Sequence, residues 1–206
     1  MEREIRAFDF EVRAEENEEH GHFLTGRPIV YGQRTNIGWY DEIIEAGALD
    51  VTDLKDVRLL VNHNTDMIPL ARSRNNNDNS TMQLVPDQDG MTMRADLDIE
   101  NNSDAKNLYS AVKRGDISGM SFMFTVDGDS WDDVDTEHPT RHVRSIRRVM
   151  EVSAVTWPAY SATSIQTRGL ADGLESAKAS LESEKARLAA IEKRKQRIRI
   201  LTEVNK

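Results

Sequence analysis

Short segments in which apolar and polar residues alternate fill the chain up to about residue 167. Phe8, Phe10 and Val12 alternate with polar residues, which is typical of a half-buried strand. Asp89-Gly90 is a strong hairpin signal between TMQLV and MTMRADLDI. After this turn, period-2 spacing places five apolar residues on one face: Met91, Met93, Ala95, Leu97 and Ile99. The pattern predicts many short strands in an antiparallel barrel or sandwich.

One helix interrupts the strands. Ser103 is the predicted N-cap, an apolar stripe runs from Ala105 to Val112, and Gly115 provides a C-terminal stop. The next segment, ISGMSFMFTV, predicts a strand with Ser121 on the face opposite Phe122. HVRSIRRV and MEVSAVTWPA predict two further strands, and DGDSWDDVDTEH predicts a solvated, mobile loop. We therefore expect a mainly β (α+β) fold with flanking helices.

The chain changes character near residue 168. Charged residues, alanine and leucine dominate, and no proline occurs, which predicts a helical tail over 168–206 after a domain over 1–167. Two heptad positions carry its apolar residues, interrupted by Glu184 and Lys195: Leu170, Ala177, Ile191 and Ile198 in one, and Leu174, Leu181 and Leu188 in the other. The tail is either a single solvated helix or a coiled coil with itself or a partner. Its basic segment KRKQRIR is either a solvated face or a docking site for an acidic partner.

Composition excludes several classes of protein. The 206 residues include no cysteine, which rules out disulfides, thiolate zinc sites and a cysteine nucleophile. The net charge of -9 argues against general nucleic-acid binding, because phosphate contacts require a basic surface. No apolar run approaches the length of a membrane span or a signal peptide. We expect a soluble, intracellular protein without a metal or cofactor.

Three residues are candidates for nucleophilic catalysis. His63 ends the apolar run VRLLV between Asn62 and Asn64, a setting that suits a catalytic base. Ser121 projects from a strand of bulky residues and Gly119 lies close by, as a rigidly held nucleophile near an oxyanion site requires. Glu151 precedes VSAV in a strand-like run and could orient the base. Taken singly, each residue also fits a purely structural role.

Five segments in a fixed order resemble the prohead protease family of tailed phages, which is related in fold to the herpesvirus assembly proteases. They are GRPIVYGQRTNIG, WYDEIIEAGAL, VRLLVNHN, GDISGMSFMF and EVSAVTWPAYSAT, and the resemblance covers roughly residues 5 to 167. It implies a herpesvirus-protease-like antiparallel β-barrel with surrounding helices. It also implies a serine endopeptidase that acts inside the immature capsid, in the host cytoplasm.

The resemblance also assigns site residues. The serine of its G-M-S-F segment falls on Ser121, the histidine of L-x-N-H on His63, and the acid of E-V-S on Glu151. The herpesvirus relatives use a second histidine as third member, which makes His142 the alternative and His138 the next. An arginine-associated oxyanion site would fall on Arg147 and Arg148, and Met123 stands where relatives commonly have glycine.

The implied substrate is the scaffolding segment of the major capsid protein, together with the protease itself. Selective packaging of the protease needs a docking element, for which the helical tail is the candidate. The sequence is also compatible with two rival functions. One is a non-enzymatic scaffold or assembly protein with the same barrel and tail. The other is a metal-dependent hydrolase that uses the histidines and the acidic segment DGDSWDDVDTEH.

Overall fold

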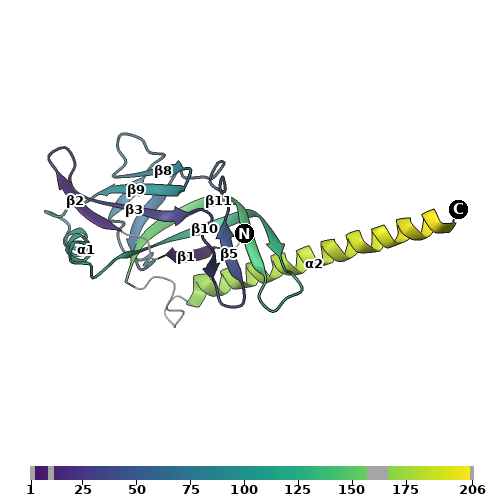
Figure 1. The fold of residues 1–206 in the computed structure, drawn as a ribbon. Helices are drawn as coiled ribbons and strands as arrows, with labels where there is room; N and C mark the ends of the chain where they lie inside the picture. The colour runs from purple at the N-terminus through teal and green to yellow at the C-terminus, as the bar shows by residue number, and fades with distance from the viewer. Residues whose placement is uncertain (1–2, 9–11, 157–166, 205–206) are drawn as a thin grey trace.

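The structure is a computed structural model that describes residues 3–8, 12–156 and 167–204. Within these residues the chain forms eleven strands and two helices (Figure 1). The elements are β1 (Glu4–Phe8), β2 (Arg13–Asn17), β3 (Gly21–Val30), β4 (Thr35–Asn36), β5 (Asp41–Ile44), β6 (Val57–Val61), β7 (Ala71–Ser73), β8 (Met82–Asp87), β9 (Gly90–Asp96), α1 (Ser103–Arg114), β10 (Gly119–Asp132), β11 (Thr140–Val155) and α2 (Thr167–Val204). Phe10 and Pro158, which entered the strand predictions, lie outside the described residues.

The strands form two sheets. The larger has the order β1-β10-β11-β5-β4, with β6 pairing β11 and β7, and the smaller has the order β2-β3-β9-β8. β11 pairs antiparallel with β10 on one side and parallel with β5 and β6 on the other. The mainly β fold with helices is therefore confirmed. The expectation of one closed barrel is not met in the described residues, because their strands pair as two separate sheets.

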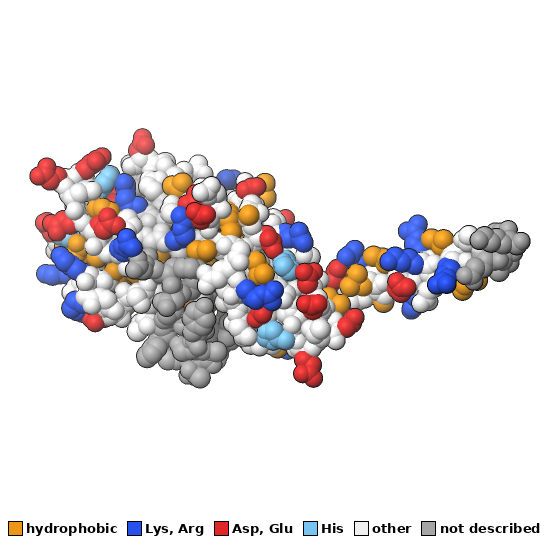
Figure 2. Space-filling model, viewed as in Figure 1, with side chains coloured by type: hydrophobic (Ala, Val, Ile, Leu, Met, Phe, Trp, Pro, Cys, Tyr) orange, Lys and Arg blue, Asp and Glu red, His pale blue; other side chains and the backbone are white. Residues whose placement is uncertain are grey.

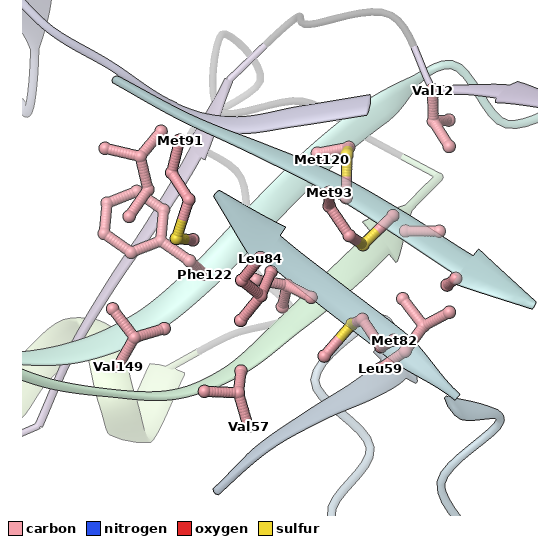
Figure 3. Packing of buried hydrophobic residues seen from close by; sticks show 14 of the residues in the cluster. Val12, Val57, Leu59, Met82, Leu84, Met91, Met93, Met120, Phe122 and Val149 are labelled. Carbon is pink, nitrogen blue, oxygen red and sulfur yellow. The ribbon is translucent and has the colours of Figure 1, made fainter. Parts of the chain in front are cut away.

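The main core lies between the two sheets. Figure 3 shows Met91 and Met93 of the smaller sheet near Phe122 and Met120 of β10, and Met82 near Leu59 of β6. The period-2 prediction is confirmed, since Met91, Met93, Ala95 and Leu97 are buried and Ile99 packs against the same cluster. Each fully buried side chain of this size contributes about 1.5–3 kcal/mol relative to an exposed one. This core packs against one face of β10, and Ser121 lies on the opposite face.

The predicted helix forms with a one-residue correction at its start. Asn102, and not Ser103, is the N-cap, because Asn102 is extended (φ −116°, ψ 106°) and its side chain accepts from the N–H groups of Asp104 and Ala105. Ser103 is already helical. Gly115 ends the helix in the left-handed conformation (φ 80°), as predicted.

The hairpin of β10 and β11 is longer than the sequence indicates. The first half of the predicted loop DGDSWDDVDTEH belongs to β10, and the two strands predicted over HVRSIRRV and MEVSAVTWPA are one strand, β11. A second small core explains the extension. Trp131 is 5% exposed and its ring stacks on Trp39 with centroids 5.7 Å apart, so the outer part of the hairpin is packed and not solvated.

The tail forms one helix, α2, as predicted. Ala177 and Leu181 are buried against Tyr40 and Trp131 in the second core. Gly173 allows close approach to β1, since a Cβ there would lie 3.3 Å from Glu4 Cγ. The C-terminal part of α2 extends away from the sheets (Figure 1). Among the described helices, none is both long and apolar enough to cross a membrane.

A buried ionic network joins β1, β5 and β11. Arg6 donates through Nε to Glu42 Oε1 at 2.5 Å and through Nη2 to Glu42 Oε2 at 2.7 Å, while Arg141 donates to Glu4 Oε2 at 2.7 Å. All four side chains are at most 3% exposed. Burial alone would raise the pKa of Glu42, but the charges and hydrogen bonds of Arg6 and Arg141 outweigh it and hold that pKa below its ordinary value.

The variant Glu42→Gln tests this network. It removes one of the two buried carboxylates that Arg6 and Arg141 share and leaves excess buried positive charge, so we expect a loss of about 3–5 kcal/mol in the free energy of unfolding near pH 7. Because folding lowers the pKa of Glu42, the wild type should lose stability as pH falls below about 4.5. The variant should lack that part of the pH dependence.

The free energy of unfolding of each variant is measured by urea unfolding at several pH values between roughly pH 3 and pH 7. Glu100→Gln, at an exposed glutamate, is the matched control and should follow the wild type. If the free energy of unfolding fell equally with pH in Glu42→Gln and wild type, the network would not control stability in acid.

Candidate active site

Ser121 lies near the start of β10, on the face turned away from the main core. It pairs with Ala7 of β1 on one side and with Ser153 of β11 on the other. Alternation along β10 buries Met120 and Phe122 in the core and leaves the Ser121 hydroxyl on the opposite face. A strand held between two neighbours fixes Oγ more firmly than a loop would.

His63 lies in a tight turn directly after β6. Asn62 N–H donates to Ala154 O at 3.0 Å, which carries the pairing of β6 with β11 one residue past the strand. Asn62 and His63 then both adopt left-handed conformations, with φ of 50° and 55°. Such values are uncommon outside glycine, although Asn and His tolerate them better than most residues do. The turn directs the His63 ring back over β10 and β11.

The three predicted residues, far apart in sequence, meet in a hydrogen-bonded chain. His63 Nε2 lies 2.6 Å from Ser121 Oγ, and His63 Nδ1 lies 2.5 Å from Glu151 Oε1. An ionised carboxylate can only accept, so Nδ1 carries the proton shared with Glu151 and the lone pair of Nε2 faces the serine. This is the arrangement in which a histidine can remove the proton of a serine hydroxyl.

The serine hydroxyl has a second acceptor. Ser121 Oγ donates to the carbonyl oxygen of Arg6 on β1 at 2.7 Å, so this oxygen and His63 Nε2 compete for one proton. Ser121 is 0% exposed, and the side chains of His63 and Glu151 are 5% and 4% exposed. The hydrogen-bonded chain of Glu151, His63 and Ser121 is therefore enclosed.

The alternative third members lie elsewhere. His142 occupies the outer part of β11, where Nδ1 lies 2.6 Å from Glu45 Oε1 and Nε2 lies 3.3 Å from Asp132 Oδ2. His138 Nε2 lies 2.9 Å from Asp41 Oδ1. Glu151, and neither of these histidines, is the residue placed against Nδ1 of His63.

The predicted arginine-associated oxyanion site is not placed beside the serine. Arg147 and Arg148 are exposed on β11, and Arg148 is in register with Thr125, four residues along β10 from Ser121. Arg148 Nε lies 3.8 Å from Asp53. Among the described residues, no cluster of three His, Cys, Asp or Glu side chains has the arrangement of a metal site.

Two contacts of this site were not predicted from the sequence. Besides the Arg6 carbonyl, Ser153 donates to Glu151 Oε2 at 2.5 Å. The spacing of Glu151 and Ser153, two apart on a strand, was the available signal, since it puts both side chains on one face.

A strand-held serine, a histidine and a carboxylate in this order define the class of serine hydrolases that use a hydrogen-bonded triad. The family model described as caudovirus prohead serine protease matches residues 8–176. The chain therefore belongs to the caudovirus prohead serine protease family.

Individual relatives were also found. The prohead protease of Enterobacteria phage HK97 is 26% identical over 121 residues, which cover 59% of this chain and 48% of that protein. The chain thus spans about half the length of this relative. The structure of the bacteriophage T4 capsid assembly protease, gp21, aligns with a TM-score of 0.36 and 11% identity over 76% of this chain and 99% of that one.

Substitutions at Asn62 test the left-handed turn that directs His63. Asn62→Ala and Asn62→Gly both remove the amide that bonds Thr156, but only glycine adopts φ of 50° without steric cost. We expect the alanine variant to be less stable than the glycine variant by about 1 kcal/mol in urea unfolding.

Asn64 provides the matched comparison, because it is exposed and its φ is not positive. There the order should reverse, with alanine more stable than glycine. The same order at both positions would mean that the turn in solution differs from the one described.

Proposed function

We propose that the chain is a serine endopeptidase in which Ser121 is the nucleophile, His63 the general base and Glu151 the residue that orients His63. The observation that supports these roles is the chain of hydrogen bonds from Glu151 through His63 to Ser121. His63 would remove the hydroxyl proton as Oγ attacks the peptide carbonyl, and would later give it to the leaving amine. Glu151 would stabilise the imidazolium that forms between these steps.

The proposed substrate is the scaffolding segment of the phage major capsid protein, with self-cleavage in addition. Family membership supports this substrate, because the family takes its name from the prohead. Confinement inside the prohead would raise the effective concentration of substrate, so that a slow enzyme in an enclosed site could suffice. We also propose, on the family resemblance alone, that the two-sheet fold is related to the herpesvirus assembly proteases.

The variant Ser121→Ala tests the catalytic assignment. Wild type incubated with its capsid protein should release discrete fragments that intact mass spectrometry detects. Ser121→Ala should cleave at least about 10⁴-fold more slowly and release no detectable fragment. Ser118→Ala is the matched control, since Ser118 is exposed and three residues away, and it should cleave as wild type does.

Other outcomes identify the rival functions. Capsid maturation that proceeds normally with Ser121→Ala would favour the non-enzymatic scaffold protein. Cleavage that a chelator abolishes would favour the metal-dependent hydrolase.

The exposed part of α2 is the proposed docking segment. Between Lys185 and Leu201 the helix carries seven Lys and Arg residues and a single Glu, whereas the whole chain has a net charge of -9. Leu188, Ile191 and Ile198 continue the stripe that Leu181 begins against the sheets, and they are 39%, 38% and 55% exposed. Figure 2 shows basic and hydrophobic side chains along this rod. A capsid scaffold with acidic, amphipathic helices, or a second copy of α2, would fit it.

Deletion of residues 186–206 tests docking without disturbing the second core, which involves α2 only as far as Leu181. The truncated protein should cleave capsid protein in solution at the wild-type rate but be at least about tenfold depleted from proheads. Replacement of Leu188, Ile191 and Ile198 by serine should have the same effect. Normal packaging of the truncated protein would exclude this segment as the docking element.

A further inference from the structure

Ser153 lies beside the triad on β11, in register with Ser121 of β10 and Leu60 of β6. Its side chain shares a face with Glu151, and the residue is 0% exposed. A buried hydroxyl needs hydrogen-bond partners, and both partners of Ser153 belong to the triad.

The two hydrogen bonds of Ser153 have unambiguous directions. The backbone N–H of His63 donates to Ser153 Oγ at 3.1 Å, so the hydroxyl accepts there. Its single hydrogen is then free for Glu151 Oε2, which lies 2.5 Å away. A closed ring results: His63 backbone to Ser153, Ser153 to Glu151, and Glu151 to the ring of His63.

This closed ring of hydrogen bonds restrains the carboxylate of Glu151 and the backbone of His63, on which the position of the base depends. The carboxylate of Glu151 uses Oε1 for His63 and Oε2 for Ser153, and two contacts prevent it from rotating about its last torsion. The backbone of His63, left-handed at φ 55°, is tied to β11 by the N–H bond to Ser153. Left-handed non-glycine residues are strained and persist only where their surroundings hold them.

We propose that Ser153 is a positioning residue for the triad: it holds the backbone of His63 and the carboxylate of Glu151 in the geometry that directs Nε2 at Ser121. It acts through these two residues and does not touch the substrate. The proposal rests on the proposed function for its kinetic consequence, but the positioning itself can be observed without any substrate.

The first readout is kinetic, with the capsid protein as substrate. Ser153→Ala should lower kcat by about 10–100-fold with KM within about twofold of wild type, since supporting hydrogen bonds around a site typically have effects of this size. Ser153→Thr keeps the hydroxyl and should restore kcat to within about fivefold. Ser145→Ala, at a half-buried serine also on β11, is the matched control and should leave kcat unchanged.

The second readout is the proton NMR signal of His63 Nδ1–H, which a short bond to a carboxylate moves far downfield. Ser153→Ala should move this signal upfield or broaden it, while Ser153→Thr and Ser145→Ala should retain it. A role limited to packing would lower stability but leave the signal in place. If Ser153→Ala does not fold, Ser153→Cys keeps the shape of the side chain with a slightly larger and much weaker hydrogen-bonding group, and should show the same changes in smaller measure.

The outcomes separate the two proposals. Wild type that cleaves in a Ser121-dependent way, with Ser153→Ala unchanged in kcat and in the signal, would overturn the positioning role alone. Wild type that never cleaves would contradict the proposed function, and the NMR comparison would still decide the role of Ser153. Loss of the signal with Ser153→Ala and its return with Ser153→Thr would establish the positioning.

Discussion

The pairing of β11 with strands on both of its sides is the constraint on which the rest of the structure depends. Antiparallel pairing with β10 sets Ser121 opposite Ser153. Parallel pairing with β6 sets Glu151 opposite Arg58 and ends where the chain turns at His63. A shift of one residue in either register would place Glu151 or Ser121 on the opposite face. The same hairpin, at its outer end, supplies Trp131 for the second core and so anchors α2.

The edge of this sheet is fixed by charge as well as by apolar packing. β1 pairs with β10 beside the serine, and its Arg6 and Glu4 belong to the buried network with Glu42 and Arg141. Removing such charges from water is costly, and the cost is offset only because each has close partners. Backbone and side chain of Arg6 therefore have separate effects: the side chain holds β1 in place, and the carbonyl oxygen competes with His63 for the hydroxyl proton of Ser121.

Local sequence patterns predicted the features that follow from periodicity and from the conformation of single residues. The apolar face of β9, the left-handed Gly115 and the placement of Ser121 opposite the core follow from alternation and turn chemistry alone. The sequence alone made Glu151 only a candidate partner of His63, because a glutamate on a strand is most often a surface residue, and the family resemblance strengthened that assignment. Choosing among Glu151, His142 and His138 was possible only once the strands were placed.

The features that the sequence did not predict depend on contacts between residues that are far apart in the chain. Asp129, Ser130 and Trp131 lie in a polar, acidic segment, yet they are strand residues because Trp39, Tyr40 and α2 cover the tryptophan. Glu4, Arg6 and Arg141 look like surface charges until β1, β5 and β11 are brought together. The only sequence signal for Ser153 is its spacing from Glu151, and its second partner, His63, is ninety positions away.

Activation of Ser121 by His63 is the step on which the proposed function depends. Reaction with a fluorophosphonate, followed by peptide mapping, tests this step most directly, because the reagent requires an activated serine and no knowledge of the substrate. We expect one adduct, on Ser121, that forms in wild type and is lost in His63→Ala. An adduct on another serine, or labelling of Ser121 that does not depend on His63, would contradict it.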